Sequence, residues 1–304
     1  MDVLSIFGPT SSGKTELAIA VAETLRRQGE DPVAVSCDAI QVYRGLEIIS
    51  GAATTEQRSR LEHRLIGFVD PREEFSAGQF AALARAEIDA LLAARRRPIV
   101  VGGTGLYMRA ALAELDLRPP VEAALRRGVE EEIAERGAAA LHTELPSDVA
   151  EKVNPNDAKR VSRATELIRA GQEPAERSGE LWTTRLRRPT LTVAILADRG
   201  VLEERINLRV DAMVEAGVTD EIRRLEAGGI SRTAKAALGF EQFLADDVEG
   251  VKTAHRRYAR RQLTWLRKMG ADLEVEQGDG GHELAAAQIV AALRRDQPPH
   301  PPGD

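Results

Sequence analysis

A phosphate-binding loop is the clearest chemical feature of the sequence, and it occupies residues 8–15, GPTSSGKT. The pattern matches G-x-x-x-x-G-K-[ST], in which glycines let successive backbone N–H groups face phosphate oxygens. Lys14 adds a full charge for the terminal phosphate, and the Thr15 hydroxyl is placed to bind Mg²⁺. The motif suits a nucleoside triphosphate or a diphosphate leaving group, so by itself it leaves the reaction open. The residues expected to bind phosphate are Gly8, Thr10, Ser11, Ser12, Gly13, Lys14 and Thr15.

A second chemical candidate is Asp38, which follows the apolar run 32–36. In a parallel sheet, ligands bind at the carboxyl ends of the strands, so we expect this carboxylate beside the phosphate loop. Three roles are open to it: a ligand of Mg²⁺ through water, a general base, or the N-cap of a helix.

The phosphate loop needs a strand before it and a helix after it, and the sequence predicts both. Residues 3–7 are an apolar run of strand length, and apolar residues recur at helical spacing over 17–25. With the run 32–36 this makes a strand–helix–strand unit and hence a parallel sheet. Further strands are predicted at 98–101 and 191–196, and a helix at 80–92. In this context a chance match to the loop motif has a probability below about one in ten.

The chain has 304 residues, which favours one core with an inserted subdomain. We predict an α/β fold with a P-loop NTPase-like parallel sheet flanked by helices. Its core is expected over 1–115 and 189–295, with helices and glycine breaks over 202–293. Residues 116–188 are charged and helical in pattern, so we expect an α-helical insertion there. The proline-rich end, 296–304, is expected to be disordered.

Composition limits the partners. The net charge of −6 argues against nucleic-acid affinity from bulk charge, so any such surface must be a local basic patch. The single cysteine, Cys37, excludes a disulfide or cysteine zinc site within one chain. There is no run of transmembrane length and no signal-peptide pattern, so we expect a cytoplasmic protein, and a monomer, with no membrane partner.

The strongest basic segment runs from 252 to 268, where cations alternate with Tyr258 and Trp265. Cations with stacking aromatics suit an RNA backbone and splayed bases. The alternative is a charged exterior face with both aromatics in the core. Lys159, Arg160 and Arg163 form a smaller patch in the insertion.

Residues 36–46, SCDAIQVYRGL, closely resemble the second motif of bacterial tRNA dimethylallyltransferases, also called tRNA isopentenyltransferases. The resemblance continues in order along nearly the whole chain. Its further blocks are 63–66 with 69–71 and 74–76, then 98–107, 154–164, 205–213 and 258–267.

The resemblance implies transfer of a dimethylallyl group from its diphosphate to N6 of the adenosine 3′ of the anticodon, with Mg²⁺ as cofactor. It implies that Asp38 is the general base and that Thr104 and Arg205 act on the diphosphate, although Arg205 alone would be read as part of a solvated helix face. The target base must leave its stack, which is inexpensive in a single-stranded loop. The implied contacts with the anticodon stem-loop are Asp38, Ala39, Ile40, Gln41, Lys159, Arg160, Val161, Ser162, Arg163, Arg260, Arg261, Gln262, Trp265 and Arg267.

The sequence departs from the family pattern at Ala39, at 49–53, at Arg64 and at Phe240, and these departures bear on tRNA preference and turnover. Two other enzymes compete with this interpretation. One is a P-loop kinase of a small metabolite, for which 64–70 offers an apolar run ending in Asp70. The other is an adenylate isopentenyltransferase, which the basic block 260–267 and the helical insertion disfavour.

Overall fold

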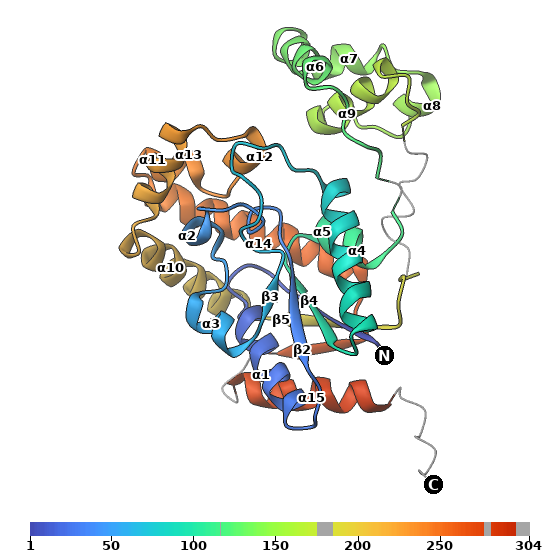
Figure 1. Cartoon of the computed structure of the whole chain (residues 1–304). Helices are drawn as coiled ribbons and strands as arrows, with labels where there is room; N and C mark the ends of the chain where they lie inside the picture. Colours follow the sequence, from blue (N-terminus) through green and yellow to red (C-terminus); the bar gives the residue numbers. More distant parts are fainter. Residues whose placement is uncertain (116, 175–184, 277–280, 296–304) are drawn as a thin grey trace. The chain divides into compact units, whose positions relative to one another are not determined.

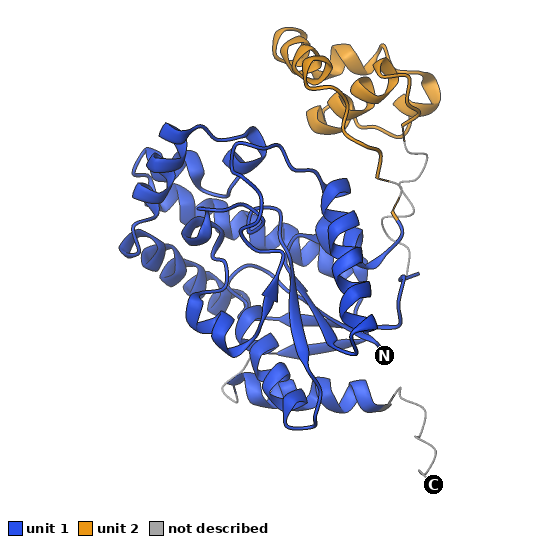
Figure 2. Cartoon of the chain, in the orientation of Figure 1, with its two compact units in different colours: residues 1–114, 184–304 blue, residues 115–183 orange. Residues whose placement is uncertain are grey.

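The computed structural model describes residues 1–115, 117–174, 185–276 and 281–295, which fall into two compact units (Figure 2). Unit 1 comprises Met1–Glu114 and Thr184–Asp304, and unit 2 comprises Leu115–Thr183. The sequence predicted an insertion over 116–188, and the second unit ends at Thr183 instead. The predicted disorder of 296–304 lies outside the described residues.

A six-stranded parallel sheet forms the centre of unit 1, in the order β3-β2-β4-β1-β5-β6 (Figure 1). The strands are β1 (Val3–Phe7), β2 (Pro32–Cys37), β3 (His63–Arg64), β4 (Arg97–Gly102), β5 (Thr190–Leu196) and β6 (Leu273–Glu276). The central strands are apolar because helices cover both faces, as parallel sheets require. The predicted α/β fold class and the four predicted strands are confirmed.

The two edge strands, β3 and β6, were not predicted from the sequence. β3 has two residues, and β6 falls in the segment 202–293 that was predicted to be helical, so that prediction is wrong at 273–276. In β6 only Val275 is buried, while Glu274 and Glu276 face solvent. Four residues with one buried side chain are too few for a period to appear, and pairing with β5 decides the conformation.

Helices cover both faces of the sheet (Figure 1). α1 and α15 lie together on one face, where Leu17 and Ile289 pack on Ile6 and Val193. α4 and α5 cover β2 and β4 on the other face. The helices of unit 1 that flank the sheet or follow its strands are α1 (Lys14–Arg26), α2 (Glu47–Ser50), α3 (Thr55–Arg60), α4 (Ala77–Ala93), α5 (Gly105–Leu112) and α15 (Gly281–Arg295).

A second group of helices stands over the carboxyl edge of the sheet (Figure 1). It consists of α10 (Arg199–Glu215), α11 (Val218–Gly228), α12 (Arg232–Lys235), α13 (Phe240–Leu244) and α14 (Val248–Met269). α14 packs against α10, α13 and α5. Leu202 and Ile206 of α10 meet Ala259 of α14 in their own small core. This packing turns selected polar side chains of α10 and α14 toward the ends of the strands.

Unit 2 is a small helical body with a separate core of Val129, Leu141 and Val161. Its helices are α6 (Ala123–Arg136), α7 (Ala138–His142), α8 (Ser147–Ala150) and α9 (Ala158–Arg169). In neither unit do the described residues include a helix with both the length and the hydropathy needed to span a bilayer.

Candidate functional site

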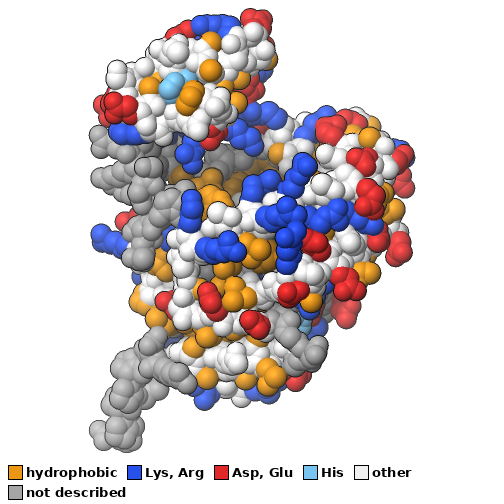
Figure 3. Space-filling view, turned by 180° about the vertical axis from the view of Figure 1, so that it is seen from behind, with side chains coloured by type: hydrophobic (Ala, Val, Ile, Leu, Met, Phe, Trp, Pro, Cys, Tyr) orange, Lys and Arg blue, Asp and Glu red, His pale blue; other side chains and the backbone are white. Residues whose placement is uncertain are grey.

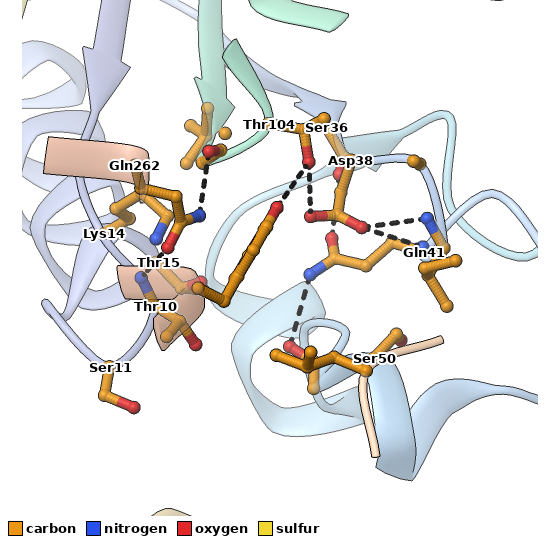
Figure 4. Close-up of a pocket in the computed structure, with 18 of the residues that line it drawn as sticks. Thr10, Ser11, Lys14, Thr15, Ser36, Asp38, Gln41, Ser50, Thr104 and Gln262 are labelled. Carbon is orange, nitrogen blue, oxygen red and sulfur yellow. Dashed lines mark hydrogen bonds between the residues drawn. The ribbon is translucent and has the colours of Figure 1, made fainter. Parts of the chain in front are cut away.

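A cavity of about 680 Å³ opens at the carboxyl ends of β1, β2 and β4 (Figure 4). Parallel strands end at the same edge, so the loops after Phe7, Cys37 and Gly102 meet there. The helices α10, α12 and α14 supply the rest of the lining. The predicted catalytic and diphosphate residues that line the cavity are Thr10, Ser11, Gly13, Lys14, Thr15, Asp38, Thr104 and Arg205. The tertiary fold therefore gathers residues that lie up to about two hundred positions apart.

The phosphate loop is tightly turned. Gly13 has φ 74° and begins α1, and Ser11 also adopts a positive φ, of 61°. Such a run of turned residues forms a concave nest of N–H groups at a helix N-terminus, which favours an anion. The hydroxyls of Ser11 and Ser12 are buried and have no hydrogen-bond partner among the residues that the structure describes. Because buried polar groups are nearly always satisfied, these two orphans indicate a polar ligand at the loop.

Four cations line the same cavity: Lys14, Arg205, Arg209 and Arg261. Burial, and secondly the charge of Arg209, lower the pKa of Lys14 to about 7, although Asp38 opposes the shift. The guanidinium of Arg209 donates to Ser50 O at 3.3 Å and packs directly against Gly51. A side chain at position 51 would collide with it, because its Cβ would lie 1.8 Å from the guanidinium. A lysine that has lost part of its charge next to an arginine marks a site built for an anion.

Diphosphate binding is expected to take up a proton at Lys14, because a phosphate group would restore the charged form. With a pKa of about 7, Lys14 is about one-tenth neutral at pH 6 and about nine-tenths neutral at pH 8. Calorimetry can measure how many protons the protein takes up when it binds a non-reactive allylic diphosphate, by comparing buffers of different ionisation enthalpy. The number of protons taken up per protein should therefore rise by nearly one from pH 6 to pH 8. Lys14→Arg, whose side chain stays charged, should lose the pH-dependent part. Equal uptake in both proteins would contradict the assignment.

Asp38 lies at the centre of a short hydrogen-bonded chain (Figure 4). Its Oδ2 accepts from the Thr104 hydroxyl at 3.3 Å, and that hydroxyl lies 3.2 Å from the Tyr258 hydroxyl. Since Thr104 has only one proton to donate, Tyr258 must donate to Thr104. Burial, and secondly the charge of Asp38, raise the pKa of Tyr258 to about 12, so the phenol keeps that proton. The chain fixes the orientation of the Asp38 carboxylate toward the cavity.

The other oxygen of Asp38 has a structural role. Its Oδ1 accepts from the backbone N–H groups of Ile40 at 2.9 Å and Gln41 at 3.3 Å. These bonds hold a turn, and no helix begins there, so the N-cap alternative is wrong as it was stated. Thr104 shows the converse: it is the N-cap residue of α5, yet its hydroxyl bonds to Asp38 and not to the helix. Both residues are thus arranged around the cavity.

Gln262 joins the phosphate loop to the turn after β4. Its Oε1 accepts from Thr10 N and its Nε2 donates to Gly103 O, both at 2.8 Å (Figure 4). A Cβ on Gly103 would come within 2.3 Å of that amide, so only glycine admits it. Gln262 is 4% exposed and its amide is used within the protein. These two bonds give Gln262 a positioning role in the phosphate site, and its implied contact with tRNA stays a prediction.

Replacing Gln262 with leucine is expected to impair the phosphate site and the fold together. The change leaves Thr10 N–H and Gly103 C=O without partners, and each loss costs about 1–3 kcal/mol. We expect the free energy of unfolding to fall by about 2–5 kcal/mol and the KM for the donor to rise. Denaturant unfolding and donor kinetics measure both effects. Gln28→Leu, in the exposed turn that follows α1, should change stability by less than about 0.5 kcal/mol. A donor KM unaltered by Gln262→Leu would argue against the positioning role.

The residues expected to meet the base are half-buried in the cavity wall: Ala39, Ile40 and Gln41. The amide of Gln41 already bonds at both ends, with Ser36 Oγ at 2.8 Å and Gly51 O at 3.3 Å. To recognise an adenine edge, Gln41 would have to exchange one of these partners for the base.

Lys and Arg side chains gather on the face seen in Figure 3. On α14, Arg260, Arg261 and Arg267 are exposed, as a phosphate-binding surface requires. Trp265 is half-buried and packs against Gly105, where a Cβ would lie 2.2 Å from its ring. The aromatic therefore belongs to the packing between α14 and α5, in line with the core alternative for this residue.

In unit 2 only part of the implied contact set is accessible. Lys159 and Arg160 are exposed in the first turn of α9. Val161 is fully buried in the core of the unit, so its side chain is not accessible in this fold. Arg163 is half-buried and donates to Pro119 O at 2.7 Å and Glu166 at 3.1 Å, and Ser162 also bonds to Glu166. These two side chains stabilise the unit.

Several residues of the cavity were not predicted from the sequence, and Arg209, His255 and Tyr258 are three of them. By sequence pattern alone, the helix face that Arg209 shares with Arg205 fits solvent, and Tyr258 fits a basic surface or the core. The available signal was spacing, because Arg209 lies one turn after Arg205 and Tyr258 lies one turn before Gln262, so each pair shares a helix face. Only the packing of α10 on α14 reveals that these faces look into the cavity.

The structure removes the basis for the kinase alternative. Residues 64–70 do not form a strand beyond Arg64, and Asp70 does not line the cavity. Asp70 accepts from Arg72 at Nε (2.9 Å) and Nη2 (2.6 Å), and these bonds hold the pKa of its carboxyl far below the usual range. Asp70 thus closes a surface turn with Arg72.

The IPP transferase family model matches residues 41–269. The chain is 40% identical to the tRNA dimethylallyltransferase of Anaeromyxobacter dehalogenans strain 2CP-1 over 281 residues, which cover 88% of this chain and 90% of the relative. It is 38% identical over 285 residues to that of Thermobifida fusca strain YX, covering 88% and 87%.

Solved structures are similar as well. The tRNA isopentenylpyrophosphate transferase of Bacillus halodurans superposes with a TM-score of 0.68 at 30% identity, covering 97% of this chain and 98% of its own. A eukaryotic dimethylallyltransferase acting on tRNA gives a TM-score of 0.77 at 24% identity, covering 97% and 78%. This second likeness supports the fold alone.

Proposed function

We propose that this chain, which belongs to the IPP transferase family, transfers a dimethylallyl group from dimethylallyl diphosphate to N6 of the adenosine 3′ of the anticodon in tRNA. The observation that carries the proposal is the placement of Asp38 in the same cavity as an anion site made by the phosphate loop, Lys14 and Arg209. This reaction needs a general base and a binding site for the leaving diphosphate.

In the proposed reaction the N6 lone pair of adenine forms a bond with C1 of the allylic donor. The bond between C1 and the diphosphate oxygen breaks, and the N6 proton passes to Asp38 Oδ2. Negative charge grows on the leaving diphosphate, where the loop N–H groups, Lys14, Arg205 and Arg209 stabilise it. Thr104 and Tyr258 hold the Asp38 carboxylate in position.

The proposed cofactor is Mg²⁺ bound together with the diphosphate. The described residues contain no cluster of three His, Cys, Asp or Glu side chains that would hold a metal by itself. Mg²⁺ commonly uses one or two protein oxygens plus substrate phosphates, and the Thr15 hydroxyl beside Lys14 in the cavity wall fits that donor set. The bound ion would neutralise charge on the departing diphosphate.

The proposed contacts with tRNA are the exposed arginines of α14 in unit 1 and, separately, Lys159 and Arg160 of α9 in unit 2. Arg261 also contacts the Tyr258 ring, with 5.5 Å between its guanidinium carbon and the ring centre, and lines the cavity. It therefore links the basic face to the site where the base would arrive. Phosphate contacts of this kind make binding salt-dependent.

The test is incubation with Mg²⁺, dimethylallyl diphosphate and unmodified tRNA, followed by nucleoside analysis. We expect N6-(dimethylallyl)adenosine from a tRNA with adenosine 3′ of its anticodon, and no product from a tRNA with guanosine there. An AMP arm separates the adenylate isopentenyltransferase, which would prenylate the free nucleotide. Failure to modify any adenosine-containing anticodon loop would refute the proposed function.

A further inference from the structure

Glu221 is a buried carboxylate on α11 that has no part in the reaction described above. It is 5% exposed, and its helix buries Val218 and Ile222 beside it and packs against α2. Burial raises the pKa of the Glu221 carboxyl, because the charged form is costly away from water. A carboxylate in such a place needs hydrogen bonds that offset this cost, and Glu221 finds them on α2.

The carboxylate of Glu221 caps α2 although it lies 172 and 173 residues away from its two partners in the chain. Its Oε2 accepts from Ile48 N and its Oε1 from Ile49 N, each at 2.9 Å. These are the second and third N–H groups of the helix, which the side chain of an N-cap residue ordinarily satisfies. The N-cap residue of α2, Leu46, has no side chain that can do so. Glu221 therefore supplies the cap from another helix and fixes where α2 begins.

The other end of α2 touches the anion site. The helix has four residues and is about 6 Å long, so its two ends move together. Its last residue accepts the hydrogen bond from the Arg209 guanidinium at Ser50 O, and Gly51 packs against the same group. Ser50 also borders the cavity (Figure 4). A shift of α2 would thus move the surface against which Arg209 is held.

The position of Arg209 matters for the binding of diphosphate. Its charge contributes to the lowered pKa of Lys14, so the two cations lie close enough to act on one anion. An arginine that is held in place before the ligand arrives contributes more to binding, because an arginine that is free to move loses conformational entropy when the ligand fixes it. In this site the hydrogen bond and the packing that hold Arg209 both come from the end of α2.

We propose that Glu221 is a positioning residue for Arg209: by capping α2 it holds the end of that helix against the guanidinium and so preorganises this cation for the diphosphate. The inference rests on the proposed function for the identity of the anion. It adds a residue outside the cavity to the machinery of the site and leaves the covalent step unchanged.

The test is a double-mutant cycle of Glu221→Gln with Arg209→Met, in which calorimetry gives the Kd of inorganic diphosphate with Mg²⁺. Glutamine keeps the shape of the side chain, but its NH₂ group would face one of the two backbone N–H groups, so half of the cap is lost. In the natural protein we expect Glu221→Gln to raise the Kd about tenfold, comparable to the loss of one hydrogen bond to a charged group. In Arg209→Met the same change should raise it less than about twofold, because two substitutions that act through one group are not additive.

Glu47→Gln is the control for the loss of a negative charge at the same end of α2. Glu47 is exposed, and its Oε1 accepts from Gly45 N at 3.0 Å, which an amide oxygen can also do. Its Kd should stay within about twofold of that of the natural protein. If Glu221→Gln is too unstable to purify, Glu221→Asp takes its place in the cycle. Aspartate keeps the charge on a shorter side chain, and we expect a smaller rise in Kd with the same lack of additivity.

The outcomes separate a positioning role from a purely structural one. We expect the fall in melting temperature caused by Glu221→Gln to be the same in both Arg209 backgrounds while its effect on the Kd disappears in Arg209→Met. An equal rise in Kd in both backgrounds would overturn the inference, because Glu221 would then act without Arg209. If the natural protein binds diphosphate but transfers no dimethylallyl group, the proposed function fails, and the cycle of Kd values still decides the role of Glu221.

Discussion

Asp38→Asn is expected to lower the rate of prenyl transfer by about 10²- to 10⁴-fold, the usual contribution of a positioned general base. The amide keeps the size of the carboxylate, and its oxygen can still accept from the N–H groups of Ile40 and Gln41. What is lost is an oxygen that can take up the N6 proton. Single-turnover measurements with saturating donor and tRNA would isolate the chemical step, since binding no longer contributes to the rate.

Donor binding should survive this substitution, because the diphosphate contacts belong to other residues. Calorimetry with a non-reactive donor should give a Kd within about threefold of the natural protein, well below the tenfold change that 1.4 kcal/mol produces. Asp70→Asn is the matched control, since that carboxylate is held by Arg72 outside the cavity, and its rate should change by less than about twofold. Full activity of Asp38→Asn would remove the general-base assignment, and an equal loss in Asp70→Asn would show that the effect is not specific to the carboxylate in the cavity.

Lys14→Met is expected to lower kcat/KM for the donor by about 10²- to 10³-fold, comparable to the loss of one preorganised charge-stabilising donor. The change removes a cation at the place where charge develops and keeps a side chain of similar length. It should not destabilise the protein, because burial and Arg209 already disfavour the charged lysine. Thermal unfolding checks this point, and steady-state kinetics with varied donor check the catalytic loss.

Lys14→Met should also change how diphosphate affects the melting temperature of the protein. Diphosphate with Mg²⁺ should raise the melting temperature of the natural protein by mass action and leave that of Lys14→Met nearly unchanged. Lys235→Met is the control, because Lys235 pairs with Glu226 on the surface at 3.1 Å and lies outside the cavity. If Lys14→Met kept its rate within about fivefold, a loss of only about 1 kcal/mol, the diphosphate would have to lie elsewhere.

The central part of the fold could be predicted because its signals are local. Four strands read as apolar runs bounded by turns, and the phosphate loop is a pattern of eight consecutive residues. Asp38 was found for the same reason, since it directly follows a strand and parallel strands share an edge. The edge strands β3 and β6 carried no such signal, because two and four residues are shorter than any detectable period.

The side chains from α10 and α14 were decided by packing. By sequence, Arg205 and Arg209 fit a solvated helix face, and Gln262 and Trp265 fit a basic RNA-binding segment. In the structure both arginines line the cavity, Gln262 supports the phosphate loop, and Trp265 covers Gly105. Helical spacing says which residues share a face but not what that face meets. The phosphate loop and Asp38 were thus determined by the sequence alone, whereas the cations around Lys14 and the Tyr258–Thr104–Asp38 chain depend on contacts between elements that are far apart in the chain.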